Sequence, residues 1–420
     1  MNVKKRKGLR SLMLAAITIS LSSCWSDINT VVDSHFDENG GLIDSTQMSR
    51  FKLAAPSRIR FFVEVSGSMN GFFRPNIPTH FKEDVWQILS YYSGLASHVT
   101  ILTNSGNMGI DIPMSDFQTK MNTGAFISSA STQVPVMLQS IVNSLDSEGG
   151  EVAVLISDMK YSPIGKAAPN VLLSQYSTDV GKILGTYQKS VSLVGATSNY
   201  MDKRGASVCD NSPYYFFIIG KGEHVANIRN GISSMLEMHK RFIDNIDSGF
   251  DFGVPTCTFG IPNNCYQLDN EPTFIGFEGD TCTIKMKVDL ENYRWTMANP
   301  KVFAKAIKVN TTYGSNVSVG NIEFEVSNIT KVNGKNELVR KATAIVDLKV
   351  FDLAQDSEVI EWTLDLPDTD ATLFAPYLGA TNESDVSKSY SLENFIKGMF
   401  QGSVVNKELK SSYILISRNS

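Results

Sequence analysis

The chain has 420 residues, of which 42% are hydrophobic and 19% charged. This is the composition of a globular protein, and the length is enough for two or three domains. The formal net charge is -5 and there is no long basic patch, which argues against a nucleic-acid partner.

The first residues read as a targeting segment rather than as part of the fold. A basic head, Lys4 to Arg10, precedes the apolar run "SLMLAAITISLS", which is too short to span a bilayer comfortably. The run ends in "LSSC", which resembles the lipobox of bacterial lipoproteins. The resemblance implies a signal peptide over residues 1–23, a lipidated Cys24, and a mature protein held outside the cytoplasm in a membrane. The residues after Cys24 are compatible with the outer membrane and leave its face open. An ordinary signal peptide with a chance cysteine is the alternative.

Residues 24–56 are polar and poorly periodic, and we interpret them as a tether. From 57 to 252, apolar strand patterns alternate with helical ones. Strands are predicted at 58–65, 98–104, 151–159, 190–197 and 214–220, and helices at 81–97, 131–146, 170–188 and 224–243. This alternation favours an α/β fold: a doubly wound, mostly parallel, Rossmann-like sheet with helices on both faces. Ligands of such sheets bind beyond the carboxyl ends of the strands.

From 253 to 420 the pattern changes to alternation in twos, which predicts a second, β-rich and sandwich-like domain. Strands are expected at 281–290, 301–314, 321–332, 341–351 and 358–367, followed by a helix at 391–401 and a strand at 411–417. No chemical motif stands out in this part.

Four cysteines follow Cys24: Cys209, Cys257, Cys265 and Cys282. In an oxidising compartment they permit two disulfides with three connectivities, and small buried thiols are the alternative. Their spacing is wrong for a zinc knuckle.

The segment "RIRFFVEVSGSMNGFF" places oxygen-bearing side chains where the first strand ends. Glu64, Ser66 and Ser68 alternate after the apolar run, and Gly67 helps the chain to turn. Hard divalent cations prefer such oxygen ligands. In a metal-free alternative, the hydroxyls cap the turn and Glu64 accepts backbone N–H groups. Phe72 and Phe73, which follow directly, are predicted to be core residues.

These residues resemble the metal-ion-dependent adhesion site of the von Willebrand factor A, or integrin I-like, domain. The family motif "DxSGSM" corresponds here to "EVSGSM". The family's threonine before a helix corresponds to Thr132, with Ser129 or Ser131 as alternatives, and its later aspartate corresponds to Asp158 in "VLISDM". The resemblance implies a divalent metal held by Glu64, Ser66, Ser68, Thr132 and Asp158.

The departure is Glu64, which stands where the family has aspartate and displaces the carboxylate by about one bond length. Mg²⁺ remains the expected ion, with Mn²⁺ or Ca²⁺ as more permissive alternatives. The resemblance implies binding or adhesion to a protein partner that supplies a carboxylate to the metal, rather than an enzyme. The alternatives are a metal-free structural component of a cell-envelope assembly and, less favoured, a hydrolase acting through Glu64, Asp158 or a serine.

Overall fold

The computed structural model describes residues 35–37, 40–43, 53–103, 109–146, 149–161, 169–187, 189–249, 255–269, 271–291, 293, 300–330, 336–364, 371–402 and 411–418. The predicted signal peptide and Cys24 lie outside these residues. In the predicted tether, Phe36 and Leu42 form an isolated β-bridge, and Phe36 is buried against Val359 and Leu415. Within the described part of the chain, no helix is long and apolar enough to cross a membrane.

A seven-stranded sheet forms the centre of the first half of the chain, in the order β3-β2-β1-β4-β6-β5-β7. Its strands are β1 (Arg58–Glu64), β2 (His98–Leu102), β3 (Ile110–Pro113), β4 (Glu151–Ser157), β5 (Ser190–Met201), β6 (Ser207–Gly220) and β7 (Phe242–Ser248). The α/β class is therefore confirmed. The expectation of a mostly parallel sheet was wrong: among the described strands of this sheet, β1–β2 and β1–β4 pair in parallel and the other four neighbouring pairs are antiparallel. The long β5–β6 hairpin places an antiparallel strand beside β4.

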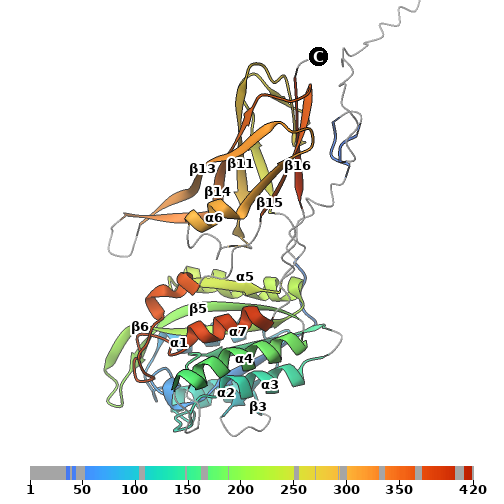
Figure 1. Ribbon diagram of the computed structural model, residues 1–420. Coiled ribbons are helices and arrows are strands. Elements are labelled where there is room, and N and C mark those ends of the chain that lie inside the picture. The colour runs from blue at the N-terminus through green and yellow to red at the C-terminus, as the bar shows by residue number, and fades with distance from the viewer. Residues whose placement is uncertain are drawn as a thin grey trace, which may run out of the picture.

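Helices cover both faces of this sheet (Figure 1). One face carries α3 (Val134–Ser144), α4 (Pro169–Tyr187) and α7 (Leu392–Gly402), and the other α1 (His80–Tyr91), α2 (Met114–Thr123) and α5 (Gly222–Met238). Strand alternation divides the core between the faces: Phe62 belongs to the first cluster, whereas Phe61 and Val63 belong to the second. Phe72 and Phe73 are buried in the second cluster, as predicted.

Several local assignments differ from the sequence prediction, and the helix predicted at 81–97 ends at Tyr91. β3 and α2 were not foreseen in the stretch after β2, where only short apolar runs occur. The helix predicted at 224–243 ends at Met238, and Phe242 begins β7. Lys240, between them, has a φ of 58°, which interrupts the helical backbone.

Two further sheets pack face to face in the second half of the chain (Figure 1). One sheet has the order β12-β15-β16-β10-β9 and the other the order β13-β14-β11-β8. Their strands are β8 (Cys257–Gly260), β9 (Tyr266–Gln267), β10 (Thr273–Ile275), β11 (Thr281–Asp289), β12 (Ile307–Thr311), β13 (Asn316–Thr330), β14 (Asn336–Phe351), β15 (Ser357–Leu364) and β16 (Ser412–Ser417). Alternate residues of both sheets, such as Met286 and Trp362, meet in one core. This is the sandwich-like arrangement expected, although 301–314 is not one strand: α6 (Pro300–Ala306) precedes β12.

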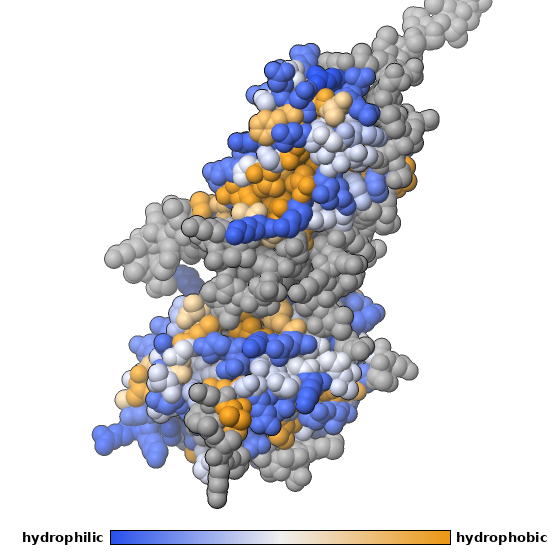
Figure 2. All heavy atoms as spheres, viewed as in Figure 1, coloured by the Kyte–Doolittle hydropathy of each residue, from blue (hydrophilic) through white to orange (hydrophobic). Residues whose placement is uncertain are grey.

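The predicted C-terminal helix lies with the first sheet rather than in the sandwich. After β15 the chain returns through a 3₁₀ segment (Ala371–Tyr377) that contacts β7, and α7 then packs along α4. Gly398 and Gly402 of α7 face Gly181 of α4 at close range. Polar residues dominate the outer face of the layer formed by α4 and α7, whereas an apolar area is visible on the sandwich (Figure 2).

We predict that Gly398→Ala destabilises the protein by about 1–2 kcal/mol. A Cβ there would lie 2.5 Å from the Ser177 carbonyl oxygen and 2.8 Å from the Val180 Cβ, so the helices must separate. The gain in helix propensity, about 1 kcal/mol, is smaller than this overpacking. Gly94→Ala, where a Cβ meets no atom within 4 Å, is the control, and we expect a change within about 0.5 kcal/mol. Urea unfolding measures both, and equal effects would contradict the close α4–α7 packing.

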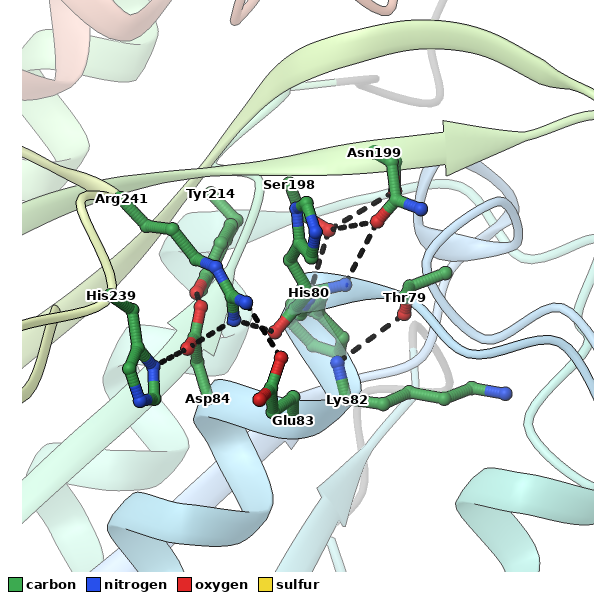
Figure 3. Close-up of polar contacts among 11 residues, drawn as sticks. Thr79, His80, Lys82, Glu83, Asp84, Ser198, Asn199, Tyr214, His239 and Arg241 are labelled. Atoms are coloured by element: carbon green, nitrogen blue, oxygen red, sulfur yellow. Dashed lines mark hydrogen bonds and ion pairs between the residues drawn. The ribbon is translucent and has the colours of Figure 1, made fainter. Parts of the chain in front are cut away.

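A buried polar network fixes the start of α1 to the far half of the sheet (Figure 3). Asp84 accepts hydrogen bonds from Tyr214 of β6 and from Arg241, and it pairs with His239 at the end of α5. The N–H groups of His80 and Phe81 donate to Asn199 and Ser198 of β5. Three distant segments thus hold the helix that follows the motif of the first strand.

The four cysteines after Cys24 are free thiols in this structure. Burial raises the pKa of Cys282 to about 12, and the neighbouring Cys265 adds to the effect. Cys257 is buried. Disulfide formation among the four therefore stays a prediction.

Candidate metal centre

Three loops meet where β1 and β4 end. The two strands are parallel neighbours, with Val63 opposite Ile156, so their carboxyl ends lie at the same edge of the sheet. A short 3₁₀ turn, Gly67–Met69, follows β1. The N–H of Gly67 donates to the carbonyl oxygen of Ala130 at 2.8 Å, which ties this turn to the loop before α3. The edge therefore gathers Glu64, Ser66, Ser68, Thr132 and Asp158, all five predicted residues, from three separate parts of the sequence.

Glu64 is fully buried and is held by hydroxyl groups. Thr132 donates to Oε1 at 2.7 Å, and Ser157 donates to Oε2. Burial and, as a smaller effect, the negative charge of Asp158 together raise the pKa of Glu64 from 4.5 to about 7, against the opposing effect of these hydroxyls. Thr132, rather than Ser129 or Ser131, thus contacts the carboxylate.

Ser66 and Ser68 lie side by side after β1. Their Oγ atoms are 2.9 Å apart, and either can be the donor. Asn70 supports this turn through a pair of hydrogen bonds with the backbone of Ser128, at 2.7 and 2.9 Å. The two hydroxyls are therefore positioned by a braced loop.

Asp158 is buried, and its carboxylate is only partly satisfied. Oδ1 accepts the N–H of Lys160 at 3.2 Å, whereas Oδ2 has no hydrogen-bond partner in the described part of the chain. Burial raises the pKa of Asp158, and the positive charge of Lys160 and the nearby hydroxyl of Ser68 partly offset this. Met159, at a φ of 54°, turns the chain here, and its N–H donates to the Ser157 hydroxyl at 2.8 Å. An unpaired buried carboxylate oxygen is costly, and a cation is one way to compensate it.

The sequence did not single out Ser157 or Lys160, although both act at this edge. Ser157 lies at the end of an otherwise apolar strand, two residues after Leu155, and strand alternation could have placed it on the side of Glu64. Lys160 is buried, and its ammonium donates to the carbonyl oxygens of Glu383 and Asp385, at 3.2 and 2.7 Å. Those partners are more than 220 residues away, so no local pattern could have found them.

The donor set fits a hard divalent cation. Two carboxylates and three hydroxyls supply only oxygen ligands, as Mg²⁺, Mn²⁺ and Ca²⁺ prefer, with no sulfur or nitrogen ligand of the kind typical of zinc. Among the described residues, no group of three or more His, Cys, Asp or Glu side chains could hold a metal. This centre differs from such groups because hydroxyls provide most of its ligands.

The comparisons with known proteins returned no relatives. No protein-family model, no curated protein and no solved structure matches the chain. We therefore base the proposed function on the residues of this chain alone.

Proposed function

We propose that the chain is a membrane-anchored, extracytoplasmic lipoprotein that binds a protein partner through a divalent metal at this edge of the sheet. The observation that carries the proposal is the convergence of Glu64, Ser66, Ser68, Thr132 and Asp158. Asp158 adds support, because its Oδ2 has no hydrogen-bond partner in the described part of the chain and so offers a buried carboxylate oxygen to a cation.

The resemblance to the von Willebrand factor A domain belongs to this proposal. In its favour, β1 is central, β2 and β4 flank it in parallel, and β3 forms an antiparallel edge. The centre lies beyond the carboxyl ends of these strands, where open α/β sheets bind ligands. Against a simple match, the antiparallel β6 occupies the position beside β4. The resemblance is therefore proposed for the β3-β2-β1-β4 half of the sheet.

The ligand set explains why a protein carboxylate is the proposed target. Hydroxyl ligands carry no charge, so two carboxylates at most neutralise a divalent cation, and the cation keeps affinity for a further anionic oxygen. An acidic side chain of a partner is such an oxygen. Ser68 is half-buried and lies on the accessible side of this centre, whereas Glu64, Ser66 and Thr132 are buried.

A metal-free scaffold is the second candidate, and one observation favours it. Each carboxylate oxygen of Glu64 already accepts a hydrogen bond, one from Thr132 and one from Ser157. The carboxylate therefore has hydrogen-bond partners without a cation. On this view the chain is a structural component of a cell-envelope assembly. A hydrolase remains the third candidate and requires turnover that is lost in Glu64→Gln.

Thermal unfolding of the fragment that begins after Cys24 tests the metal proposal. A ligand that binds only the folded state raises the unfolding midpoint, so Mg²⁺, Mn²⁺ or Ca²⁺ should give a saturable increase. We predict that Ser68→Ala removes most of this increase and leaves the free energy of unfolding in chelator within about 0.5 kcal/mol of the wild type, because Ser68 is only half-buried. An equal increase of the unfolding midpoint in the wild type and in Ser68→Ala would mean that the cation binds elsewhere on the protein. No shift in the wild type, with a shift in Glu64→Asp, would favour the scaffold.

The lipid anchor is tested separately in the full chain. We predict that wild type sediments with membranes and that Cys24→Ala moves to the soluble fraction or retains its signal peptide. Continued, unchanged lipid labelling of Cys24→Ala would contradict the lipobox interpretation.

A further inference from the structure

Tyr176 is a buried side chain beside the candidate metal centre that no sequence motif singled out. It lies in α4, has no exposed surface, and stacks on Tyr161 with ring centroids 4.1 Å apart. Tyr161 follows Asp158 by three residues. The stack therefore places Tyr176 against the loop that carries the half-satisfied carboxylate.

Strand alternation puts Tyr176 and the centre on the same face of the sheet. Phe62 of β1 and Leu155 of β4 belong to the core cluster that contains Tyr176. Glu64 and Ser157 each lie two residues further along these strands and so point to the same face. Tyr176 thus lies on the same face of the sheet as Glu64 and Ser157, the face that α3 and α4 cover.

The hydroxyl of Tyr176 and the Oδ2 of Asp158 share an unusual property. Both are buried polar atoms without a hydrogen-bond partner in the described part of the chain. Leaving either unpaired is unfavourable for the folded state. Burial raises the pKa of Tyr176 well above its usual value, and the charges of Glu64 and Asp158 add to the effect, so the phenol remains protonated and keeps an O–H that can donate.

We propose that Tyr176 is a positioning residue of the centre, whose hydroxyl donates to an oxygen held between it and Oδ2 of Asp158. That oxygen is a water, and when the centre is loaded it is a water of the divalent cation. This inference rests on the proposed function for the cation. The water itself requires only the two unpaired atoms, which a single bridging molecule satisfies.

Tyr176→Phe tests the inference, because it removes the hydroxyl and keeps the ring. We expect Mn²⁺ or Mg²⁺ to bind about 10-fold more weakly, the effect typical of losing a group that orients a metal ligand. Tyr187→Phe is the matched control. Tyr187 lies in the same helix and also has a buried, unpartnered hydroxyl, but it is 11 residues away, about 16 Å along the axis. Its replacement should leave the divalent affinity unchanged. Equal affinities for wild type and Tyr176→Phe would overturn the inference while leaving the metal proposal intact.

A second measurement decides the case in which wild type binds no divalent ion. In chelator, the unfolding midpoints of Tyr176→Phe, Asp158→Asn and the double variant form a thermodynamic cycle. A shared water predicts non-additive changes, because Tyr176→Phe removes one of its two partners and Asp158→Asn replaces the carboxylate of the other with a neutral amide. Additive changes would overturn the inference. The same cycle with Tyr187→Phe should be additive.

Discussion

Asp84→Ala is expected to lower the free energy of unfolding by about 3–5 kcal/mol, the cost typical of breaking a buried ion pair from one side. The Asp84 side chain has no exposed surface. It accepts from Tyr214 at 2.7 Å and from Arg241 at 2.6 Å, and it pairs with His239 at 2.7 Å (Figure 3). Removing the carboxylate leaves the buried phenol of Tyr214 without its acceptor and takes from the largely buried guanidinium of Arg241 its one fully buried carboxylate partner among the described residues. Urea or thermal unfolding measures the loss.

The neighbouring acidic residue provides the control for this prediction. Glu83 pairs with the same Arg241, at 2.6 Å, but its side chain is 58% exposed. Solvent screens exposed ion pairs, so Glu83→Gln should cost less than about 1 kcal/mol. If Asp84→Ala were as mild as Glu83→Gln, the network would not anchor α1, and the position of the loop that carries Ser66 and Ser68 would need another explanation.

Glu64→Gln is expected to make the metal-free protein more stable at pH 8, by up to about 3 kcal/mol. Burial raises the folded-state pKa of Glu64 from 4.5 to about 7. Between these values the folded chain holds a proton that the unfolded chain has released. The stability contributed by this group is therefore fully present below about pH 4.5 and is lost as the pH rises through about 7. Glutamine, which is neutral throughout, does not suffer this loss.

The comparison requires unfolding curves of wild type and Glu64→Gln in chelator between pH 5 and pH 8. The two proteins should be similar at pH 5 and diverge toward pH 8. Glu64→Gln should still show some decline, because burial also raises the pKa values of Asp158 and Asp247. With a saturating divalent cation, wild type should regain stability at pH 8 and Glu64→Gln should regain less. A glutamine variant that is less stable than wild type at pH 8 in chelator would show that the ionised carboxylate is stabilised by Thr132 and Ser157 alone.

The sequence predicted the candidate site more completely than it predicted the sheet. Glu64, Ser66 and Ser68 are adjacent in one short motif, and Thr132 and Asp158 are each marked by a neighbouring helix or strand pattern. No comparable sequence pattern indicates the direction of β6, because apolar periodicity is the same for parallel and antiparallel strands. The β5–β6 hairpin also has a five-residue connection, 202–206, without a strong two-residue turn signal.

Long-range packing explains the other omissions. α7 was predicted correctly as a helix, but its sequence does not indicate that it packs on α4, more than 200 residues earlier. Tyr176 reads as one apolar position of an amphipathic helix, and only the folded chain brings it to Asp158 through the stack on Tyr161. Residues of this kind become visible as site components through burial and missing hydrogen-bond partners rather than through a motif.

The metal centre is tested most directly by the binding of Mn²⁺ to the purified fragment that begins after Cys24. Electron paramagnetic resonance of the free ion measures this binding. We predict one saturable Mn²⁺ site per chain in the wild type, from which Mg²⁺ displaces Mn²⁺. We predict that Ser68→Ala and Asp158→Asn lose this site while both variants remain folded. Binding that is absent from wild type, or that is unchanged in both variants, would contradict a metal centre at the ends of β1 and β4.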